Sequence, residues 1–215
     1  MTTPIKICGL STLEAVDRAA DLGADMAGFI FFEKSPRHVA VETAAALAER
    51  ARARGLKTVT VTVDMDDAGL KEIVSAVKPD WLQLHGGESP ERVAELKARF
   101  GRPVMKALAI RTASDLDRIA PYMGIADRFL FDAKPPEGSD LPGGNGVSFD
   151  WRLLASLDGA ANYMLSGGLT KDNVGTALAI SHAPGIDVSS GVESAPGVKD
   201  LAMMDSFVRA VRDAG

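Results

Sequence analysis

The sequence predicts an α/β protein, a single (β/α)8 or TIM barrel of eight parallel strands covering residues 1–215 as one catalytic domain. Three observations support this prediction. Short apolar or alternating segments recur along the chain, and each is followed by a helical pattern with capping signals. Eight such pairs fill the sequence without a linker. Glycines and polar residues gather just after the strands, where barrels of this class build their active sites.

The first expected strand runs from Pro4 to Gly9, and its two faces differ in chemistry. Side chains alternate along a strand, so Ile5 and Ile7 share one face while Lys6 and Cys8 share the other. In a parallel barrel one face meets the outer helices and the other points inward. We therefore expect Lys6 and Cys8 inside the barrel, with Cys8 at the carboxyl end of its strand.

The remaining elements are predicted from apolar runs, helical spacing, N-terminal caps and terminal glycines. Further strands are expected over residues 26–32, 58–63, 81–85, 104–109, 128–132, 163–166 and 185–189. Helices are expected over residues 12–22, 41–54, 66–77, 89–100, 112–122, 150–157, 173–181 and 200–213. The longest loop, residues 133–148, is rich in proline and glycine, and its length indicates function or mobility.

Composition excludes several classes of protein. The net charge is −5, and the basic residues do not cluster as they do in proteins that bind nucleic acid or anionic membranes. One cysteine excludes an intrachain disulfide and favours a reducing compartment. The N-terminus has no signal-like pattern, and no apolar run reaches membrane-spanning length. We expect a soluble cytoplasmic protein with 46% hydrophobic residues, enough for a large core.

Two loops of similar composition follow the seventh and eighth strands, and both suit a phosphate group. Glycines let backbone N–H groups approach an anion closely, and serine hydroxyls add further donors. Barrels of this class often hold phosphate between these two loops. The alternative is that the glycines only make tight turns. The residues assigned to phosphate binding are Ser166, Gly167, Gly168, Ser189, Ser190 and Gly191.

Cys8 and Asp132 are the candidate catalytic residues, at the carboxyl ends of the first and sixth strands. A thiol can act as a general base if a positive neighbour lowers its pKa, and Lys6 lies on the same face as Cys8. A carboxylic acid can protonate a leaving oxygen if an apolar wall keeps it protonated. The alternatives are a small buried hydrophobic residue for Cys8 and a loop-capping carboxylate for Asp132.

Other polar residues at the same end are assigned to substrate binding. Arg37 can hold a substrate carboxylate through its guanidinium fork, or be a solvated loop charge. His85 faces inward and can bind substrate or be a satisfied barrel histidine. Lys106 is also expected to face inward and to pair with a carboxylate. The substrate-binding set is Lys6, Arg37, Gln83, His85 and Asp187, with a structural hydrogen bond favoured for Asp187.

The sequence offers no site for a metal or a nucleotide cofactor. Its His, Cys and carboxylate residues lack metal-ligand spacing. It contains neither a Gly-rich dinucleotide fingerprint nor a Gly-x-Ser-x-Gly elbow. We therefore expect neither a metal site nor a dinucleotide site of the fingerprint type.

An ordered set of motifs resembles that of the phosphoribosylanthranilate isomerases, enzymes of tryptophan biosynthesis. The motifs are Lys6-Ile7-Cys8-Gly9, Ser35-Pro36-Arg37, Gln83-Leu84-His85-Gly86, Phe131-Asp132, Gly143-Gly144-Asn145-Gly146 with Phe149-Asp150-Trp151, Leu165-Ser166-Gly167-Gly168-Leu169, and Asp187-Val188-Ser189-Ser190-Gly191-Val192-Glu193. They span nearly the whole chain, and their order makes the resemblance specific. One departure is Asn145, where the family commonly has threonine. It affects only the detail of a glycine-rich turn.

The resemblance implies an Amadori rearrangement of N-(5-phosphoribosyl)anthranilate to an open-chain 1-deoxyribulose phosphate. By analogy Asp132 protonates the furanose ring oxygen, and Cys8 removes the proton on the sugar C2. Arg37 would hold the anthranilate carboxylate, and the two glycine-serine loops would hold the phosphate. No cofactor is implied, since the proton transfers are internal.

Three alternatives are weighed against this interpretation. Indole-glycerol-phosphate synthase would carry an extra helical segment before the first strand, and a ribulose-phosphate epimerase usually needs metal ligands. A non-catalytic barrel that binds a phosphorylated metabolite would not need both Cys8 and Asp132. Most outer-helix faces look polar, so a monomer that takes a small phosphorylated aminosugar is expected, with neither nucleic acid nor membrane as a partner.

Overall fold

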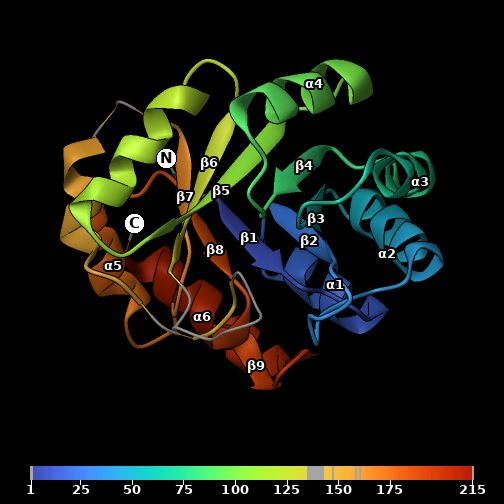
Figure 1. The fold of residues 1–215 in the computed structure, drawn as a ribbon. Coiled ribbons are helices and arrows are strands. Elements are labelled where there is room, and N and C mark those ends of the chain that lie inside the picture. Colours follow the sequence, from blue (N-terminus) through green and yellow to red (C-terminus); the bar gives the residue numbers. More distant parts are fainter. Residues whose placement is uncertain (1, 135–142, 147, 158, 160, 215) are drawn as a thin grey trace.

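The eight predicted strands form a closed parallel barrel, surrounded by helices (Figure 1). The computed structural model describes residues 2–134, 143–146, 148–157, 159 and 161–214. Strands hydrogen-bond in chain order from β1 to β8, and β8 pairs with β1 to close the circle. The predicted fold class is therefore confirmed. In the described part of the chain no helix is long and apolar enough to cross a membrane.

The observed elements agree with the predicted ones to within one residue at each end. The barrel strands are β1 (Ile5–Cys8), β2 (Met26–Phe31), β3 (Lys57–Thr62), β4 (Trp81–Leu84), β5 (Val104–Ile110), β6 (Arg128–Ala133), β7 (Tyr163–Leu165) and β8 (Ile186–Val188). The helices between them are α1 (Leu13–Asp21), α2 (Val41–Ala53), α3 (Asp67–Val77), α4 (Pro90–Phe100), η1 (Ala113–Tyr122), η2 (Trp151–Leu157), α5 (Val174–Ser181) and α6 (Leu201–Ala214).

Two features of the helical layer differ from a plain set of α-helices. The η1 and η2 segments are 3-10 helices, and η1 contains Pro121, which has no N–H to donate to an α-helical bond. A short 3-10 turn, η3 (Ser190–Val192), and a hairpin of β9 (Glu193–Ala195) and β10 (Val198–Lys199) follow β8. This hairpin, which lies at the carboxyl end of the barrel, was not predicted from the sequence.

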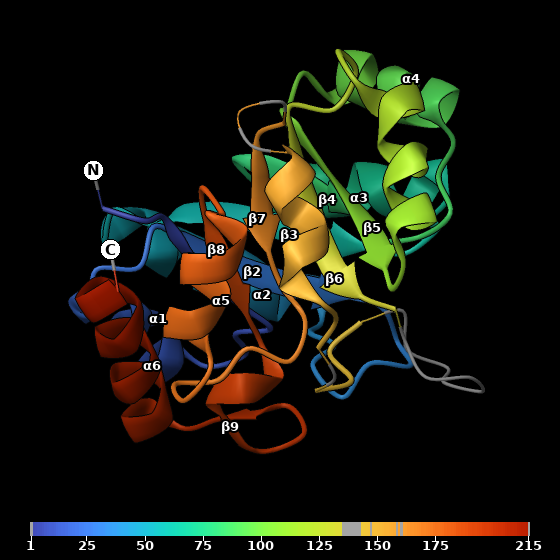
Figure 2. The same ribbon diagram turned by 90° about the vertical axis from the view of Figure 1, so that its left-hand side faces the viewer.

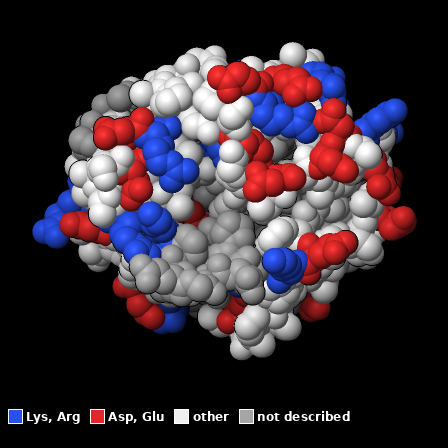
Figure 3. Space-filling view, viewed as in Figure 1, with Lys and Arg blue, Asp and Glu red and all other residues white. Residues whose placement is uncertain are grey.

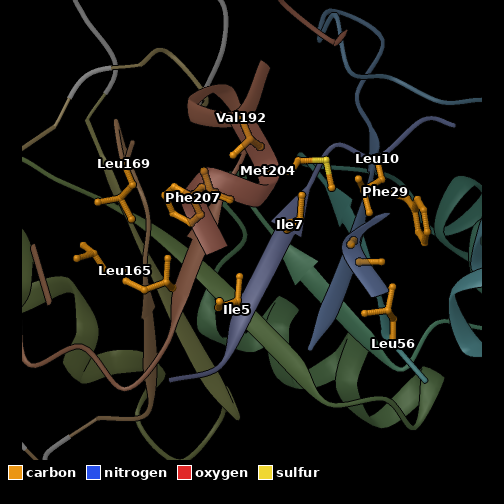
Figure 4. Packing of buried hydrophobic residues seen from close by; sticks show 14 of the residues in the cluster. Ile5, Ile7, Leu10, Phe29, Leu56, Leu165, Leu169, Val192, Met204 and Phe207 are labelled. Atoms are coloured by element: carbon orange, nitrogen blue, oxygen red, sulfur yellow. The ribbon is translucent and has the colours of Figure 1, made fainter. Parts of the chain in front are cut away.

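Apolar side chains fill both sides of the barrel wall. Ile5 and Ile7 face outward, as predicted, into a cluster with Phe207 and Met204 of α6 (Figure 4). Inside the barrel a second cluster fills the amino-terminal half and leaves the carboxyl end to polar residues. Its buried members are Met26, Val59, Met105, Ala107, Leu130 and Met164.

The final helix lies across the junction of the first and last strands of the barrel. Helix α6 contacts both α1 and α5, and the two chain ends lie at this side of the molecule (Figure 2). Arg212 of α6 donates a hydrogen bond to the Thr3 carbonyl at 2.5 Å and another to the Gly23 carbonyl at 2.8 Å. The last helix therefore covers the seam where β1 meets β8.

Lys106 does not face the interior, so that prediction is wrong. The register pairs Gln83 with Met105 and Leu84 with Lys106, which turns Lys106 outward with Leu84. Its ammonium ion-pairs with Glu88 at 2.9 Å and donates to the Gly86 carbonyl at 2.7 Å. The sequence of an apolar strand does not reveal which face its lysine is on, because both faces of a barrel strand are buried.

Candidate active site

A pocket opens at the carboxyl ends of the barrel strands, and every predicted site residue except Lys6 lines it. The predicted residues in its wall are Cys8, Arg37, Gln83, His85, Asp132, Ser166, Gly167, Gly168, Asp187, Ser189, Ser190 and Gly191. Apolar side chains in or just after β2 and β3, including Ile30, Phe32 and Val61, complete the wall. The long loop predicted over residues 133–148 lies largely outside the described residues, although Gly143 and Gly144 also line the pocket.

A buried ion pair lies beneath the pocket, between the first and last strands. Lys6 of β1 and Asp187 of β8 are register partners, and the Lys6 Nζ lies 2.7 Å from the Asp187 Oδ1. The other carboxylate oxygen of Asp187 accepts a hydrogen bond from the Ser166 hydroxyl at 3.2 Å. Burial by itself would lower the pKa of Lys6, but Asp187 and the Cys8 thiol outweigh it and raise that pKa. Lys6 is thus a fully buried cation paired with a strand neighbour.

Cys8 lies above this pair, in the pocket wall, and its electrostatics differ from the prediction. Burial raises the pKa of the Cys8 thiol above its ordinary value, and Asp187 adds to the rise. Lys6 and Lys199 act in the opposite direction but do not overcome burial. The condition considered from the sequence, a pKa lowered by Lys6, is therefore not met, because burial and Asp187 outweigh the two lysine charges.

Asp132 is the buried carboxyl group across the pocket, at the carboxyl end of β6. Its Oδ1 accepts a hydrogen bond from the Ala133 N–H at 2.9 Å, and its Oδ2 lies 3.5 Å from the His85 Nε2. The His85 Nδ1 lies 3.0 Å from the Gln83 amide nitrogen. Gln83 therefore orients His85, and His85 faces the candidate acid.

The two glycine-serine loops touch each other. Gly191 packs so closely against the Leu169 carbonyl that a Cβ at this position would overlap it. Gly167 has φ of +89° and lies beside Asp132, where a Cβ would come within 2.5 Å of the Ala133 nitrogen. Both positions thus require glycine, one for close approach and one also for its backbone conformation. The contact makes the two loops one continuous surface of the pocket.

Arg37 reaches the pocket from the loop after β2. Its guanidinium is held by Glu193, which is itself paired with Lys199, and neither residue was assigned to the site from the sequence. The Arg37 guanidinium makes a bidentate pair with Glu193, with N–O distances of 2.8 and 2.9 Å. Lys199 lies 2.6 Å from the same carboxylate. Burial would raise the pKa of Glu193, but Arg37 and Lys199 lower it overall. Burial lowers the pKa of Lys199, although Glu193 opposes it. No sequence signal indicated Lys199, because the two residues of β10 are too few to show a periodic pattern.

The fold and this polar pocket at its carboxyl end define an enzyme of the (β/α)8-barrel class. Comparison with known proteins identifies its family. The model of the family described as N-(5'phosphoribosyl)anthranilate (PRA) isomerase matches residues 5–210. The chain therefore belongs to the phosphoribosylanthranilate isomerase family.

Similar proteins with this name are found at high identity. The N-(5'-phosphoribosyl)anthranilate isomerase of Sinorhizobium fredii is 66% identical over 214 residues, covering 100% of this chain and 95% of the relative. That of Rhizobium meliloti is 65% identical, covering 100% of this chain and 99% of the relative. The crystal structure of phosphoribosyl anthranilate isomerase from Thermotoga maritima is 30% identical, with a TM-score of 0.88, and covers 99% of this chain and 100% of that one.

We predict that Cys8 is alkylated slowly at neutral pH. Iodoacetamide reacts with the thiolate, and burial raises the pKa of the thiol. The alkylation rate should therefore rise with pH, and the pH at which it is half-maximal should lie above that of an ordinary thiol. The measurement is the alkylation rate across pH, followed by mass spectrometry at this single cysteine. The same protein unfolded in urea serves as the control. A midpoint in the folded protein below that of the unfolded protein would contradict the prediction.

Proposed function

We propose that the chain catalyses the Amadori rearrangement of N-(5-phospho-β-D-ribosyl)anthranilate to 1-(2-carboxyphenylamino)-1-deoxy-D-ribulose 5-phosphate, a step of L-tryptophan biosynthesis. The observation that supports it most is the presence of Cys8 and Asp132 in one pocket, with an arginine and two glycine-serine loops. A relative 29% identical to this chain, with a TM-score of 0.86, was solved with reduced 1-(o-carboxyphenylamino)-1-deoxyribulose 5-phosphate. The test is turnover of freshly generated substrate by the purified protein.

Asp132 and Cys8 divide the reaction into two proton transfers. Asp132 gives its proton to the furanose ring oxygen as the bond from C1 to that oxygen breaks, which leaves an open-chain iminium ion. Cys8, as thiolate, then takes the proton from the sugar C2, and the electrons of that bond form the enolamine. The enolamine gains a proton at C1 and loses the proton of its C2 hydroxyl, which gives the ketone. One proton leaves Asp132 and one arrives at Cys8, and exchange with solvent restores both side chains, so no cofactor takes part.

The two residues must share one proton in a particular arrangement. Asp132 needs the proton and Cys8 must lack it, yet burial raises the pKa of the Cys8 thiol. Only the singly protonated form with its proton on the carboxyl group can carry out both transfers. The rate should be lost at low pH, where the thiol cannot act as base, and again at high pH, where no acid is left.

The remaining residues of the pocket hold the two charged ends of the substrate. Arg37 takes the anthranilate carboxylate, because a guanidinium fork matches a planar carboxylate. The glycine-serine loops take the phosphate. Gln83 and His85 contact the substrate beside Asp132. Lys6 and Asp187, although assigned to substrate binding from sequence, support the site from beneath through their ion pair.

We also propose that the chain acts as a single-domain monomer in the cytoplasm, with neither nucleic acid nor membrane as a partner. Acidic and basic side chains are interspersed over the described part of the face in Figure 3. Four large hydrophobic side chains are exposed among the described residues, on separate elements: Leu13, Met123, Val198 and Met203. The phosphoribosylanthranilate isomerase of Thermotoga maritima is dimeric, so a sizing measurement at micromolar concentration distinguishes the two states.

The acid and base roles predict large losses of turnover. Cys8→Ser replaces the thiol with a much weaker base, and Asp132→Asn removes the proton donor. Each should lose about 10²–10⁴-fold in kcat. The double variant should lose less than the product of the two losses, because the residues act on one substrate in sequence. Asp172→Asn, which changes an exposed carboxylate, is the control. A fully active Cys8→Ser enzyme would overturn the mechanism.

A negative charge in the phosphate loops should weaken binding of the substrate. Ser190→Asp places a carboxylate at the pocket wall, where it repels the phosphate, and should raise KM about tenfold or more. Ser190→Ala, which removes the hydroxyl without adding charge, should raise KM much less. The measurement is steady-state kinetics for both variants. If Ser190→Asp lowers kcat and leaves KM at its wild-type value, the phosphate does not bind here.

A further inference from the structure

The guanidinium of Arg37 has two edges, and one of them is already taken. Its Nε and Nη2 donate to the two oxygens of Glu193 at 2.8 and 2.9 Å. The Nη2 also lies 3.4 Å from the Gly144 carbonyl. A substrate carboxylate that binds in two-point fashion must therefore use the end of the guanidinium, where Nη1 and Nη2 lie side by side, and replace the long hydrogen bond that Nη2 donates to the Gly144 carbonyl. Glu193 thus decides which edge of Arg37 is offered to the pocket.

Two glycines confine the rest of the arginine side chain. The aliphatic part of Arg37 crosses Gly9, where a Cβ would lie 2.9 Å from the Arg37 Cδ. The guanidinium lies against Gly144, where a Cβ would come within 2.6 Å of the Arg37 Nη1. Arg37 is 5% exposed. Its position is therefore set on one side by close backbone approach and on the other by the carboxylate of Glu193.

The hairpin of β9 and β10 contacts the Arg37 loop a second time through its backbone. At the hairpin tip the Gly197 N–H donates to the Glu193 Oε2 at 3.2 Å. Gly197 has φ of +83°, and it packs so closely on the Pro36 carbonyl that a Cβ would overlap it. The hairpin thus touches the residue before Arg37 as well as its guanidinium.

Lys199 gives the buried cluster a net positive charge. The side chains of Arg37, Glu193 and Lys199 are each 5% exposed or less. Lys199 lies 2.6 Å from the Glu193 Oε1 and donates to the Ser189 carbonyl at 3.0 Å. An isolated pair of Arg37 and Glu193 would be neutral. With Lys199 the cluster carries one excess positive charge beside the pocket, which favours an anion.

From these contacts we infer that the hairpin of residues 193–199 positions Arg37 for the substrate carboxylate, with Glu193 as a positioning residue and Lys199 as its charge partner. The inference rests on the proposed function, because it assigns a supporting element to the carboxylate end of that substrate. Glu193 acts only through Arg37 and touches no reacting atom.

The test breaks the bidentate pair between Arg37 and Glu193 without changing the net charge of the cluster of Arg37, Glu193 and Lys199. Glu193→Gln combined with Lys199→Met removes one charge of each sign, and the amide of glutamine turns a donor toward the donors of Arg37. KM should rise about tenfold or more, while kcat stays within a few-fold of wild type, because a carboxylate held equally in both states contributes to binding alone. Asp172→Asn with Lys171→Met removes an exposed ion pair in the same way and should leave KM unchanged.

A double-mutant cycle separates positioning from a general effect on folding. In an Arg37→Ala background the same two hairpin substitutions should cause no further change in kcat/KM, because their effect passes through Arg37. An unchanged KM in the hairpin variant, or an equal loss with and without Arg37, would overturn the inference. Should the hairpin variant not fold, Gly197→Ala, which presses on Pro36 and changes no charge, must raise KM in the same way. A wild-type protein without turnover, or an Arg37→Ala variant with full activity, would instead count against the proposed function.

Discussion

The buried ion pair between Lys6 and Asp187 is the interaction on which the arrangement of the site depends. It joins β1 to β8, the two strands that close the barrel. A buried charge pair costs desolvation energy that only good geometry and additional hydrogen bonds offset, and the Ser166 hydroxyl supplies one such bond from the loop after β7. Removing either partner would leave an uncompensated charge in the interior. Closure of the barrel, the position of Cys8 and the shape of one glycine-serine loop are therefore coupled.

Apart from Arg37, the positive charge near this site lies behind the surface that the substrate would meet. The loops assigned to the phosphate contain no basic side chain, and Lys199 lies behind one of them on the Ser189 carbonyl. Arg37 reaches the pocket with one edge bound to Glu193. This arrangement lets glycine backbone approach an anion closely while buried cations supply attraction that solvent screens less than it would at a surface. Burial raises the pKa of the Cys8 thiol despite two lysines nearby, each of which is paired with a carboxylate.

The sequence predicted the fold well because the local signals agreed with each other. Asp66 and Ser89, at the starts of two predicted helices, each accept a hydrogen bond from a first-turn N–H, and the structure confirms both starts. The alternation within Ile5–Cys8 also identified the faces of the first strand. Residues at strand ends were placed in one pocket because the carboxyl ends of parallel barrel strands meet at one side.

The features missed from the sequence depend on contacts between distant parts of the chain. The direction of Lys106 follows from its register with β4, which no local pattern encodes. The pairing of Arg37 with Glu193 joins residues 156 positions apart. The pKa of Cys8 reflects burial by the whole barrel, so the charge of one neighbouring lysine was not enough to predict the direction of the pKa shift.

The division of the reaction between Asp132 and Cys8 is the central claim, and a substrate deuterated at the sugar C2 tests it most directly. A substitution that slows one of the two proton transfers makes that transfer rate-limiting. In Cys8→Ser, removal of the C2 proton should be limiting, so the deuterated substrate should react markedly more slowly than the ordinary one. In Asp132→Asn, ring opening should be limiting, and the two substrates should react at nearly equal rates. The opposite pattern, with a large isotope effect in Asp132→Asn and none in Cys8→Ser, would contradict the assignment of acid and base.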